Sequence, residues 1–455
     1  MSRQESPTVD RVAAALGDEP PTHRRIFAAL LGVTVLRDLL TVNVPLAILQ
    51  PPDTFRLPWF DLLPILPRTP LTEAAAHGAL GIMALAAAWM VLRPAGPWAP
   101  LALLAGYGAA FFVDQRSYTS NQYLLLLCLG LVAAWSGRAP AAAWPRLALR
   151  LLFTSVYVAA VAAKIDAAWL DGLIVREALL HYGTMWGPMG LDDALGAGHP
   201  IYVATAGLTL ALEAFLVVGL WVPRLRVAAV ALGVALHVGI EALMPVRCFS
   251  YLMIAGYVLY ADRPPAPRAE PAWRWLAGGV AFAVAVAGGF RAAGIYPLPP
   301  TNLLAVGAGV SLAVLLCRRA VLEQPAHPAR RGLRAAILTT LAIAHAALLI
   351  KPLVGGGDRF GFRMFRQIVV VQAETRARVG DRWRTYPMLG ATDYWFPTAA
   401  AYYWESWDEH QVFLQGYADW ILPVSGAEDA RVVARFRVND GPVRQAAYAP
   451  GGGPP

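Results

Sequence analysis

The sequence predicts an α-helical polytopic membrane protein with about nine to eleven transmembrane helices and a small extracytoplasmic α+β cap at its C-terminal end. Three observations predict this class. Of the 455 residues, 57% are hydrophobic and only 15% are charged, whereas a soluble domain carries about 25% charged residues. Apolar runs of spanning length recur along most of the chain. The arginines between these runs fall mainly into alternate loops.

The apolar runs define the helical part of the chain. Two of them, 98–113 and 301–317, are short and are expected to be tilted partial spans or re-entrant segments. We expect the runs at 26–49, 72–93, 98–113, 121–137, 147–167, 200–221, 226–244, 248–262, 273–290, 301–317 and 333–352. They predict a transmembrane helical domain over 24–353.

The arginines predict the orientation of these spans. If the N-terminal tail (1–23) is cytoplasmic, 16 arginines between Arg24 and Arg334 lie on the cytoplasmic side, and only six, between Arg56 and Arg291, lie opposite. This asymmetry follows the positive-inside rule and predicts an odd number of spans, with the C-terminal end extracytoplasmic. We expect the membrane to be a bacterial-type inner (plasma) membrane. The net charge of +8 then comes from loop arginines, so we expect the lipid bilayer and no nucleic acid as a partner.

The last 100 residues have a different composition. An extracytoplasmic α+β cap is expected over 354–448, in which alternating segments at Gln367–Thr375 and Val432–Val438 predict strands. Residues 403–421 predict a helix with an aromatic face. The Pro- and Gly-rich end, 449–455, is expected to be disordered. Earlier in the chain, the run 168–199 is expected to be a long extracytoplasmic connection.

Lys164 is the residue that stands out chemically. The chain has two lysines against 36 arginines, and Lys164 lies in an apolar run. An ammonium is costly in hydrocarbon, and a lysine placed there tends to become a free amine. A flanking charge could have been arginine, so Lys164 indicates chemistry that arginine cannot perform. The alternative is a lysine that extends its side chain to the membrane interface.

Two further groups lie at helical spacing. Tyr157 is two turns before Lys164 and shares its face. His237 lies inside an apolar run with Glu241 one turn later, and an intramembrane histidine beside a carboxylate is a candidate functional site. The alternative for His237 is a packing hydrogen bond to a neighbouring carbonyl.

Tyr157, Lys164 and His237 lie in two of four blocks of this sequence that resemble the vitamin K-dependent γ-glutamyl carboxylases. The first is Tyr157-Val-Ala-Ala-Val-Ala-Ala-Lys164-Ile-Asp166-Ala-Ala-Trp169-Leu-Asp171-Gly172, followed by His181 at the family spacing. The second is His237 followed by Cys248-Phe249-Ser250-Tyr251. The third and fourth are Gly361-Phe-Arg363-Met-Phe365 and the strand-turn Ala434–Gln445. The resemblance covers about 24–448, and bacterial relatives are known for a horizontally transferred transmembrane (HTTM) domain.

The resemblance implies hydroquinone-dependent oxygenation with Lys164 as the base. In the carboxylases, oxygen adds to deprotonated vitamin K hydroquinone, epoxidation yields a strong base, and that base removes the γ-proton of a glutamate that then captures CO2. It implies vitamin K hydroquinone or menaquinol with O2 and CO2, no metal, and a glutamate-containing peptide or small acceptor. His237 and Asn121 join Lys164 as catalytic candidates, although Asn121 stands where the family has a histidine. Supporting or quinone-binding candidates are Tyr157, Asp166, Trp169, His181, Glu241 and Arg363.

Two alternatives to a carboxylase remain open at this point. One is a quinone-dependent membrane oxygenase of the same family that acts on a small molecule or lipid without carboxylating it. The other is a non-catalytic membrane scaffold or transporter. Transporters commonly contain paired repeats with broken helices, and the sequence shows no such repeat. A scaffold has no need of Lys164 at the family spacing from Asp166 and Trp169.

Overall fold

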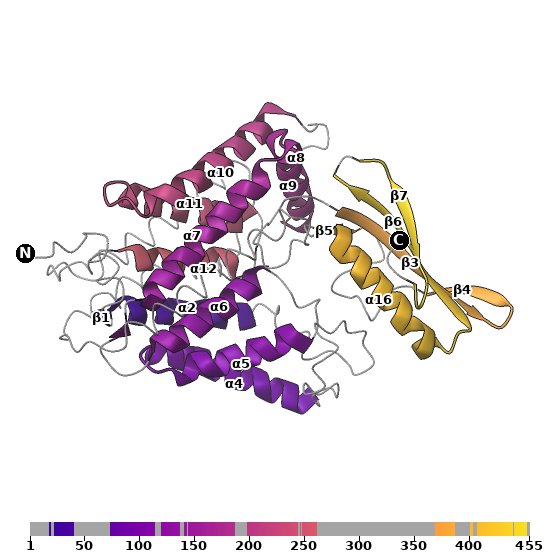
Figure 1. Cartoon of the computed structure of the whole chain (residues 1–455), viewed down its shortest axis with the longest axis horizontal. Coiled ribbons are helices and arrows are strands. Elements are labelled where there is room, and N and C mark those ends of the chain that lie inside the picture. Colours follow the sequence, from indigo (N-terminus) through magenta and orange to yellow (C-terminus); the bar gives the residue numbers. More distant parts are fainter. Residues whose placement is uncertain are drawn as a thin grey trace, which may run out of the picture.

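The structure is a computed structural model in which a helical bundle is followed by a small antiparallel sheet with one helix (Figure 1). The expected combination of a mostly helical protein and a C-terminal α+β unit is confirmed. The residues that the structure describes are 18–19, 22–40, 73–113, 120–136, 141–142, 144–186, 198–243, 246, 248–261, 369–386, 401–403, 407–439 and 441–452.

The bundle helices form where the apolar runs predict them. Its helices are α2 (Thr22–Leu40), α4 (Glu73–Leu92), α5 (Trp98–Val113), α6 (Ser120–Trp135), α7 (Trp144–Lys164), α8 (Ala167–Leu170), α9 (Leu173–Trp186), α10 (Pro200–Gly219), α11 (Arg226–Leu243) and α12 (Phe249–Gly256), which continues as the 3-10 turn η2 (Tyr257–Tyr260). A short bridge joins β1 (Asp18–Glu19) to β2 (Ala141–Ala142). The expected runs at 273–290, 301–317 and 333–352 lie outside the described residues.

The described part of the connection expected at 168–199 is helical up to Trp186, apart from the turn at Asp171 and Gly172. Helix α8 turns the chain after α7, and α9 follows directly and packs against α10. The sequence suggested a loop because Trp169, Asp171 and Gly172 interrupt the apolar pattern. In the structure Trp169 is a buried residue of α8, Asp171 is the C-cap of that helix and Gly172 is the turn before α9. Most of the described side chains in the first half of α9 are buried.

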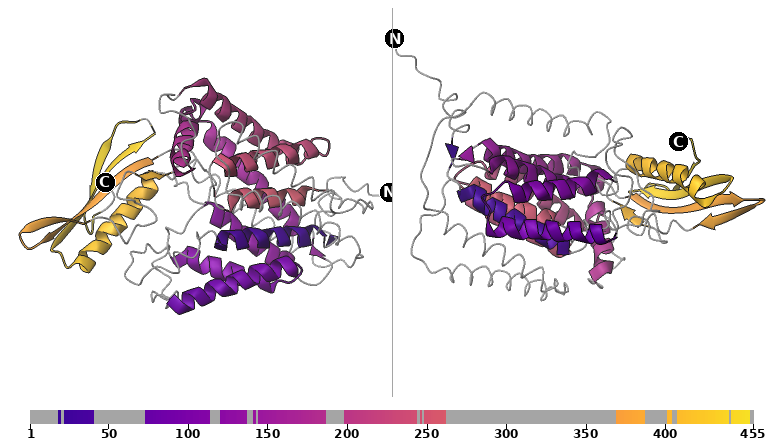
Figure 2. Two further views of the ribbon diagram at one scale, coloured as in Figure 1. Left: turned by 180° about the vertical axis from the view of Figure 1, so that it is seen from behind. Right: turned by 90° about the horizontal axis from the view of Figure 1, so that it is seen from below.

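Neighbouring helices pack closely around α7. The ring of Phe27 on α2 meets the ring of Phe153 on α7 edge to face, with centroids 6.0 Å apart. A Cβ at Gly256 would lie 2.8 Å from the Phe153 ring, so glycine allows α12 to approach α7. Both views in Figure 2 show the helices side by side in one bundle.

The outer surface of the bundle is apolar. Two helices, Pro145–Lys164 and Pro200–Gly219, are long and apolar enough to cross a membrane, and three shorter apolar helices accompany them in the part of the chain that the structure describes. Large apolar side chains are exposed on α4, α5, α7, α10 and α11, and they include Ile82, Leu85, Trp89, Leu92, Trp98, Leu151, Ile201, Leu208, Val218 and Val227. Exposed apolar side chains in this number fit the expected membrane domain.

The C-terminal unit has its own core. Its strands are β3 (Val369–Val379), β4 (Arg382–Tyr386), β5 (Ala401–Tyr403), β6 (Asp429–Val438) and β7 (Arg444–Tyr448), and its helix is α16 (Trp407–Ser425). The order is β4-β3-β6-β7, with β5 also paired to β3, all antiparallel. Alternate residues of β6 face α16, and Val432 and Ala434 are fully buried there.

Two boundaries in this unit differ from the sequence prediction. The helix begins at Trp407, not at 403, because Ala401–Tyr403 pairs with Val369–Val371 as a strand. The first strand extends to Val379, since its second half pairs with both β4 and β6. Beyond β7, the amide of Gly451 donates to the Asp419 carboxylate at 2.8 Å, which ties the start of the expected tail to α16.

Candidate functional site

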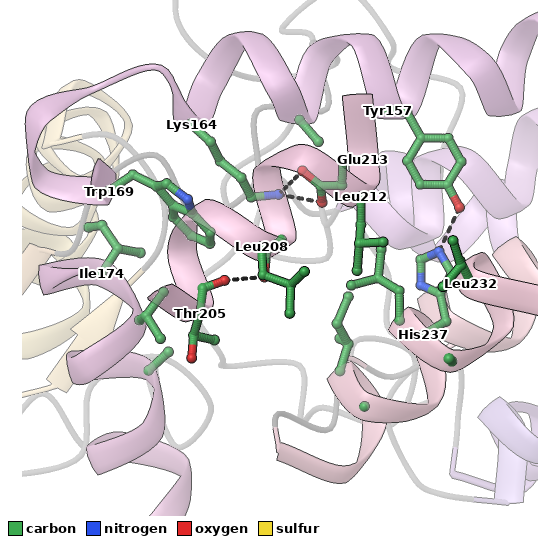
Figure 3. A pocket seen from close by; sticks show the side chains of 18 of the residues that line it. Tyr157, Lys164, Trp169, Ile174, Thr205, Leu208, Leu212, Glu213, Leu232 and His237 are labelled. Carbon is green, nitrogen blue, oxygen red and sulfur yellow. Dashed lines mark hydrogen bonds and ion pairs between the residues drawn. The ribbon is translucent and has the colours of Figure 1, made fainter. Parts of the chain in front are cut away.

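A cavity of about 320 Å³ lies between α7, α9, α10 and α11 (Figure 3). Most of its wall is aliphatic, contributed by residues such as Val156, Ile174, Leu212 and Ile240. Four polar side chains that interrupt this wall are Tyr157, Lys164, Glu213 and His237. Thr205 and Thr209 also line it, and their hydroxyls donate to backbone carbonyls one turn earlier in α10. An apolar cavity with a few convergent polar groups is the usual form of a small-molecule site.

Lys164 and Glu213 form a buried pair at one side of the cavity. The Lys164 ammonium donates to both carboxylate oxygens of Glu213, with Nζ–O distances of 2.5 and 2.6 Å. The two residues are 4% and 5% exposed, and the Trp169 ring lies 5.0 Å from Nζ. Two buried ionisable groups persist in apolar surroundings only when each satisfies the other. The pair therefore places a hydrogen-bonded amine and carboxylate at the cavity wall.

The residues after Lys164 fix the end of α7 against α10. The exposed Asp166 side chain caps α8 by accepting from the Ala168 amide at 2.9 Å. Gly172 has a φ of 77°, and a Cβ there would lie 2.7 Å from Tyr202 Cβ on α10. Trp169 donates its indole N–H to the Ala206 carbonyl at 3.2 Å. This part of the first block thus positions Lys164 against the helix that carries Glu213.

A second polar group of the cavity is a chain of three side chains. The Tyr157 hydroxyl is 2.7 Å from His237 Nε2 and 2.5 Å from the Tyr257 hydroxyl. Tyr257 fits beside α11 because position 233 is glycine, where a Cβ would lie 2.2 Å from the Tyr257 oxygen. His237 is 1% exposed. Its Nδ1 is buried and has no partner among the described residues.

Three predicted site residues do not line this cavity. Glu241 forms an ion pair with Arg37, with an N–O distance of 2.6 Å. The Arg37 guanidinium also stacks over the Tyr251 ring. Asn121 donates its side-chain amide to the Val246 carbonyl at 2.9 Å. Asp166 lies at the surface as the α8 cap. These residues support the surrounding helices.

Two other predicted residues are only partly placed or not placed. His181 falls in α9, but its side chain lies outside the described residues. Arg363 also lies outside them. The cavity therefore brings together Tyr157, Lys164, Trp169 and His237 from the predicted set.

Glu213 is the functional candidate that the sequence analysis missed. It is the one acidic residue in the 20 residues of α10. The signal was present, because an ionisable residue inside a long apolar helix is a functional candidate by default. It was overlooked because its partner is 49 residues away in sequence, at no recognisable spacing.

The comparisons with known proteins agree with the blocks in the first part of the chain. Residues 21–263 match the family model described as HTTM domain, which is the span that contains α2 to η2 and the whole cavity. Comparison with curated proteins and with solved structures gives no match. Proteins with this domain are membrane proteins. The match covers more than half of the chain, so this protein belongs to the HTTM domain family, whose domain is found in vitamin K-dependent gamma-carboxylase family proteins.

Proposed function

We propose that this protein is a membrane enzyme that deprotonates an isoprenoid hydroquinone in the α7–α11 cavity and uses it in an O2-dependent epoxidation, in the manner of the γ-glutamyl carboxylases. The observation that carries the proposal is the Lys164–Glu213 pair, in which a lysine amine is hydrogen-bonded to a carboxylate at the wall of a mostly apolar cavity.

The cavity suits a ring-sized apolar ligand with polar oxygens. Ligand pockets have volumes of about 300–1,000 Å³ and mostly apolar walls, and this cavity of 320 Å³ lies at the lower end of that range. Its polar groups lie apart, with Lys164 and Glu213 at one place and His237 at another (Figure 3). A hydroquinone supplies acidic hydroxyls and, once deprotonated, an electron-rich ring that reacts with O2.

The proposed proton transfer from the ligand to Lys164 depends on Glu213. Filling the cavity with an apolar ring expels water and raises the cost of separated charges, which favours the uncharged form of the pair with the shared proton on Glu213. The Lys164 amine then takes the hydroxyl proton of the ligand, so that an O–H bond breaks and an N–H bond forms. The resulting ammonium lies beside the negative oxygen and stabilises it.

Two leucines of the cavity wall, one on α10 and one on α11, are also exposed on the outside of the bundle. They are Leu208 and Leu232, which are 62% and 41% exposed. A side chain that touches both the cavity and the apolar exterior marks an opening toward the hydrocarbon. We therefore assign this opening to the isoprenoid tail, which would leave the cavity between these two helices.

Leu208→Trp tests this opening. The larger side chain should obstruct the tail and raise the KM for a long-tailed hydroquinone about tenfold, while the KM for a tail-less ring changes less. The matched control is Val218→Trp, on the same helix, at a residue that is 56% exposed and does not line the cavity. Equal KM values for Leu208→Trp and the control would contradict the assignment.

The carboxylation step is a separate part of the proposal. Asn121 lies outside the cavity lining and donates to a backbone carbonyl, and an amide cannot carry the charge of the histidine that the family has there. This favours, as a second candidate function, a quinone-dependent oxygenase of the same family that does not carboxylate its acceptor.

One assay distinguishes these functions. Purified protein in nanodiscs would receive reduced vitamin K or menaquinone, O2, bicarbonate and a Glu-rich peptide. Epoxide is measured by chromatography and the peptide by mass. Epoxide together with a peptide gain of CO2 establishes a carboxylase, and epoxide alone establishes the oxygenase. Absence of epoxide with every quinone would refute both.

A further inference from the structure

The unpartnered nitrogen of His237 is a polar feature of the cavity that the proton transfer to Lys164 does not use. The imidazole is 1% exposed, it lines the cavity, and only its Nε2 has a partner within the described residues. Figure 3 shows the second ring nitrogen turned away from Tyr157, toward the aliphatic side chains of the cavity. A buried polar atom without a partner costs about 1–3 kcal/mol, so it is expected where a ligand completes the hydrogen bond.

The hydroxyl chain behind the ring decides which nitrogen carries the hydrogen. Tyr157 has one hydroxyl hydrogen and two partners, His237 Nε2 and the Tyr257 hydroxyl. If Tyr257 donates to Tyr157 and Tyr157 donates to Nε2, both hydroxyl hydrogens are used. If the direction is reversed, the Tyr257 hydrogen has no acceptor among the described residues. The first arrangement leaves one group unsatisfied, and the second leaves two.

We infer that the Tyr257–Tyr157 chain holds His237 as an Nδ1–H donor that binds an oxygen of the ligand, at a position separate from the Lys164–Glu213 pair. The inference rests on the proposed function and narrows its substrate class. The ligand must carry two oxygens, one whose proton Lys164 takes and one that accepts from His237. An aromatic ring with two oxygens on opposite sides, as in a 1,4-hydroquinone and its quinone, meets this requirement.

Two substitutions of His237 separate the two ring nitrogens. The side-chain amide of asparagine occupies the position of Nδ1, and that of glutamine occupies the position of Nε2. His237→Asn therefore keeps a donor toward the cavity and gives up the bond to Tyr157. His237→Gln keeps an acceptor for Tyr157 and leaves the cavity without its donor. The two variants differ little in charge or polarity, so each is the control for the other.

The test is equilibrium binding of 2-methyl-1,4-naphthoquinone, which needs no turnover. The full-length protein in nanodiscs is dialysed against protein-free nanodiscs to correct for partition into lipid, and 2-methylnaphthalene, which has no oxygen, is the control ligand. His237→Gln should weaken quinone binding about tenfold, because one donor to a carbonyl is lost. His237→Asn should retain most of the affinity, and binding of the hydrocarbon should not change in either variant.

Each remaining outcome overturns the inference in a recognisable way. Equal weakening of the quinone in both His237 variants, or a loss that the hydrocarbon shares, means that His237 only packs the cavity. If the wild-type protein binds no quinone, the proposed function fails together with the inference. If His237→Gln does not fold, Tyr157→Phe takes its place, because it removes the hydroxyl that holds the hydrogen on Nδ1. Unchanged quinone affinity in Tyr157→Phe would then contradict the inference.

Discussion

Lys164→Arg is expected to leave the protein folded and to lower epoxide formation about 10³-fold. General acid–base groups contribute roughly 10²–10⁴ in rate, and a guanidinium cannot give up its proton to become the base. The substitution keeps a cation for the Glu213 carboxylate, so the buried pair is retained. Epoxide formation per folded protein is the measurement, with folding followed by the thermal unfolding midpoint in nanodiscs.

The second lysine supplies the control for this experiment. Lys351→Arg makes the same chemical change at a residue that has no assigned part in the site, and it should retain wild-type turnover. Full turnover in Lys164→Arg would remove Lys164 as the base. If Lys164→Arg does not fold, the rate of epoxide formation is measured instead in the double variant Lys164→Met/Glu213→Leu and compared with that of the wild type.

Removing one member of the Lys164–Glu213 pair is expected to cause a large loss of stability. A single substitution, Lys164→Met or Glu213→Leu, leaves an ionisable group buried without its partner, at a cost of about 3–5 kcal/mol. The double variant Lys164→Met/Glu213→Leu removes both groups and should recover most of this loss, because apolar replacements of buried pairs are often neutral or stabilising. The measurement is the unfolding midpoint of the three variants in detergent.

The double variant also separates stability from chemistry. It should fold as well as the wild type and still form no epoxide, since no base remains at the cavity. Additive losses in the two single variants, with no recovery in the double variant, would show that the two side chains are not coupled. Epoxide formation by the double variant would show that the base lies elsewhere.

The sequence predicted most of the helical framework because apolar runs of spanning length have few other uses. It placed α4, α5, α10 and α11 close to their observed bounds. It missed α8 and α9, since the turn residues around Gly172 resemble a loop when their partner helix is unknown. It placed the start of α16 at 403 because the pairing of β5 with β3 depends on residues at least 30 positions away.

The site was predictable only in part, for the same reason. Lys164 was identified by its rarity and by the family block, and His237 by its apolar surroundings. The partner of Lys164 and the chain from Tyr157 to Tyr257 join residues 49 and 100 positions apart. Only the packing of α10 and η2 against α7 brings them together. Glu241 was expected beside His237, but the approach of α2 gives it Arg37 as a partner.

The close packing of Gly172 predicts which substitutions this protein tolerates. Its backbone lies against Tyr202 with no room for a methyl group, so an alanine at this position would push α8 along α10 and shift Trp169 and Lys164 with it. A residue that does not itself line the cavity would then control the reaction. In a survey of natural or random variation, position 172 should therefore be as intolerant as position 164, although it has no side chain with which to act.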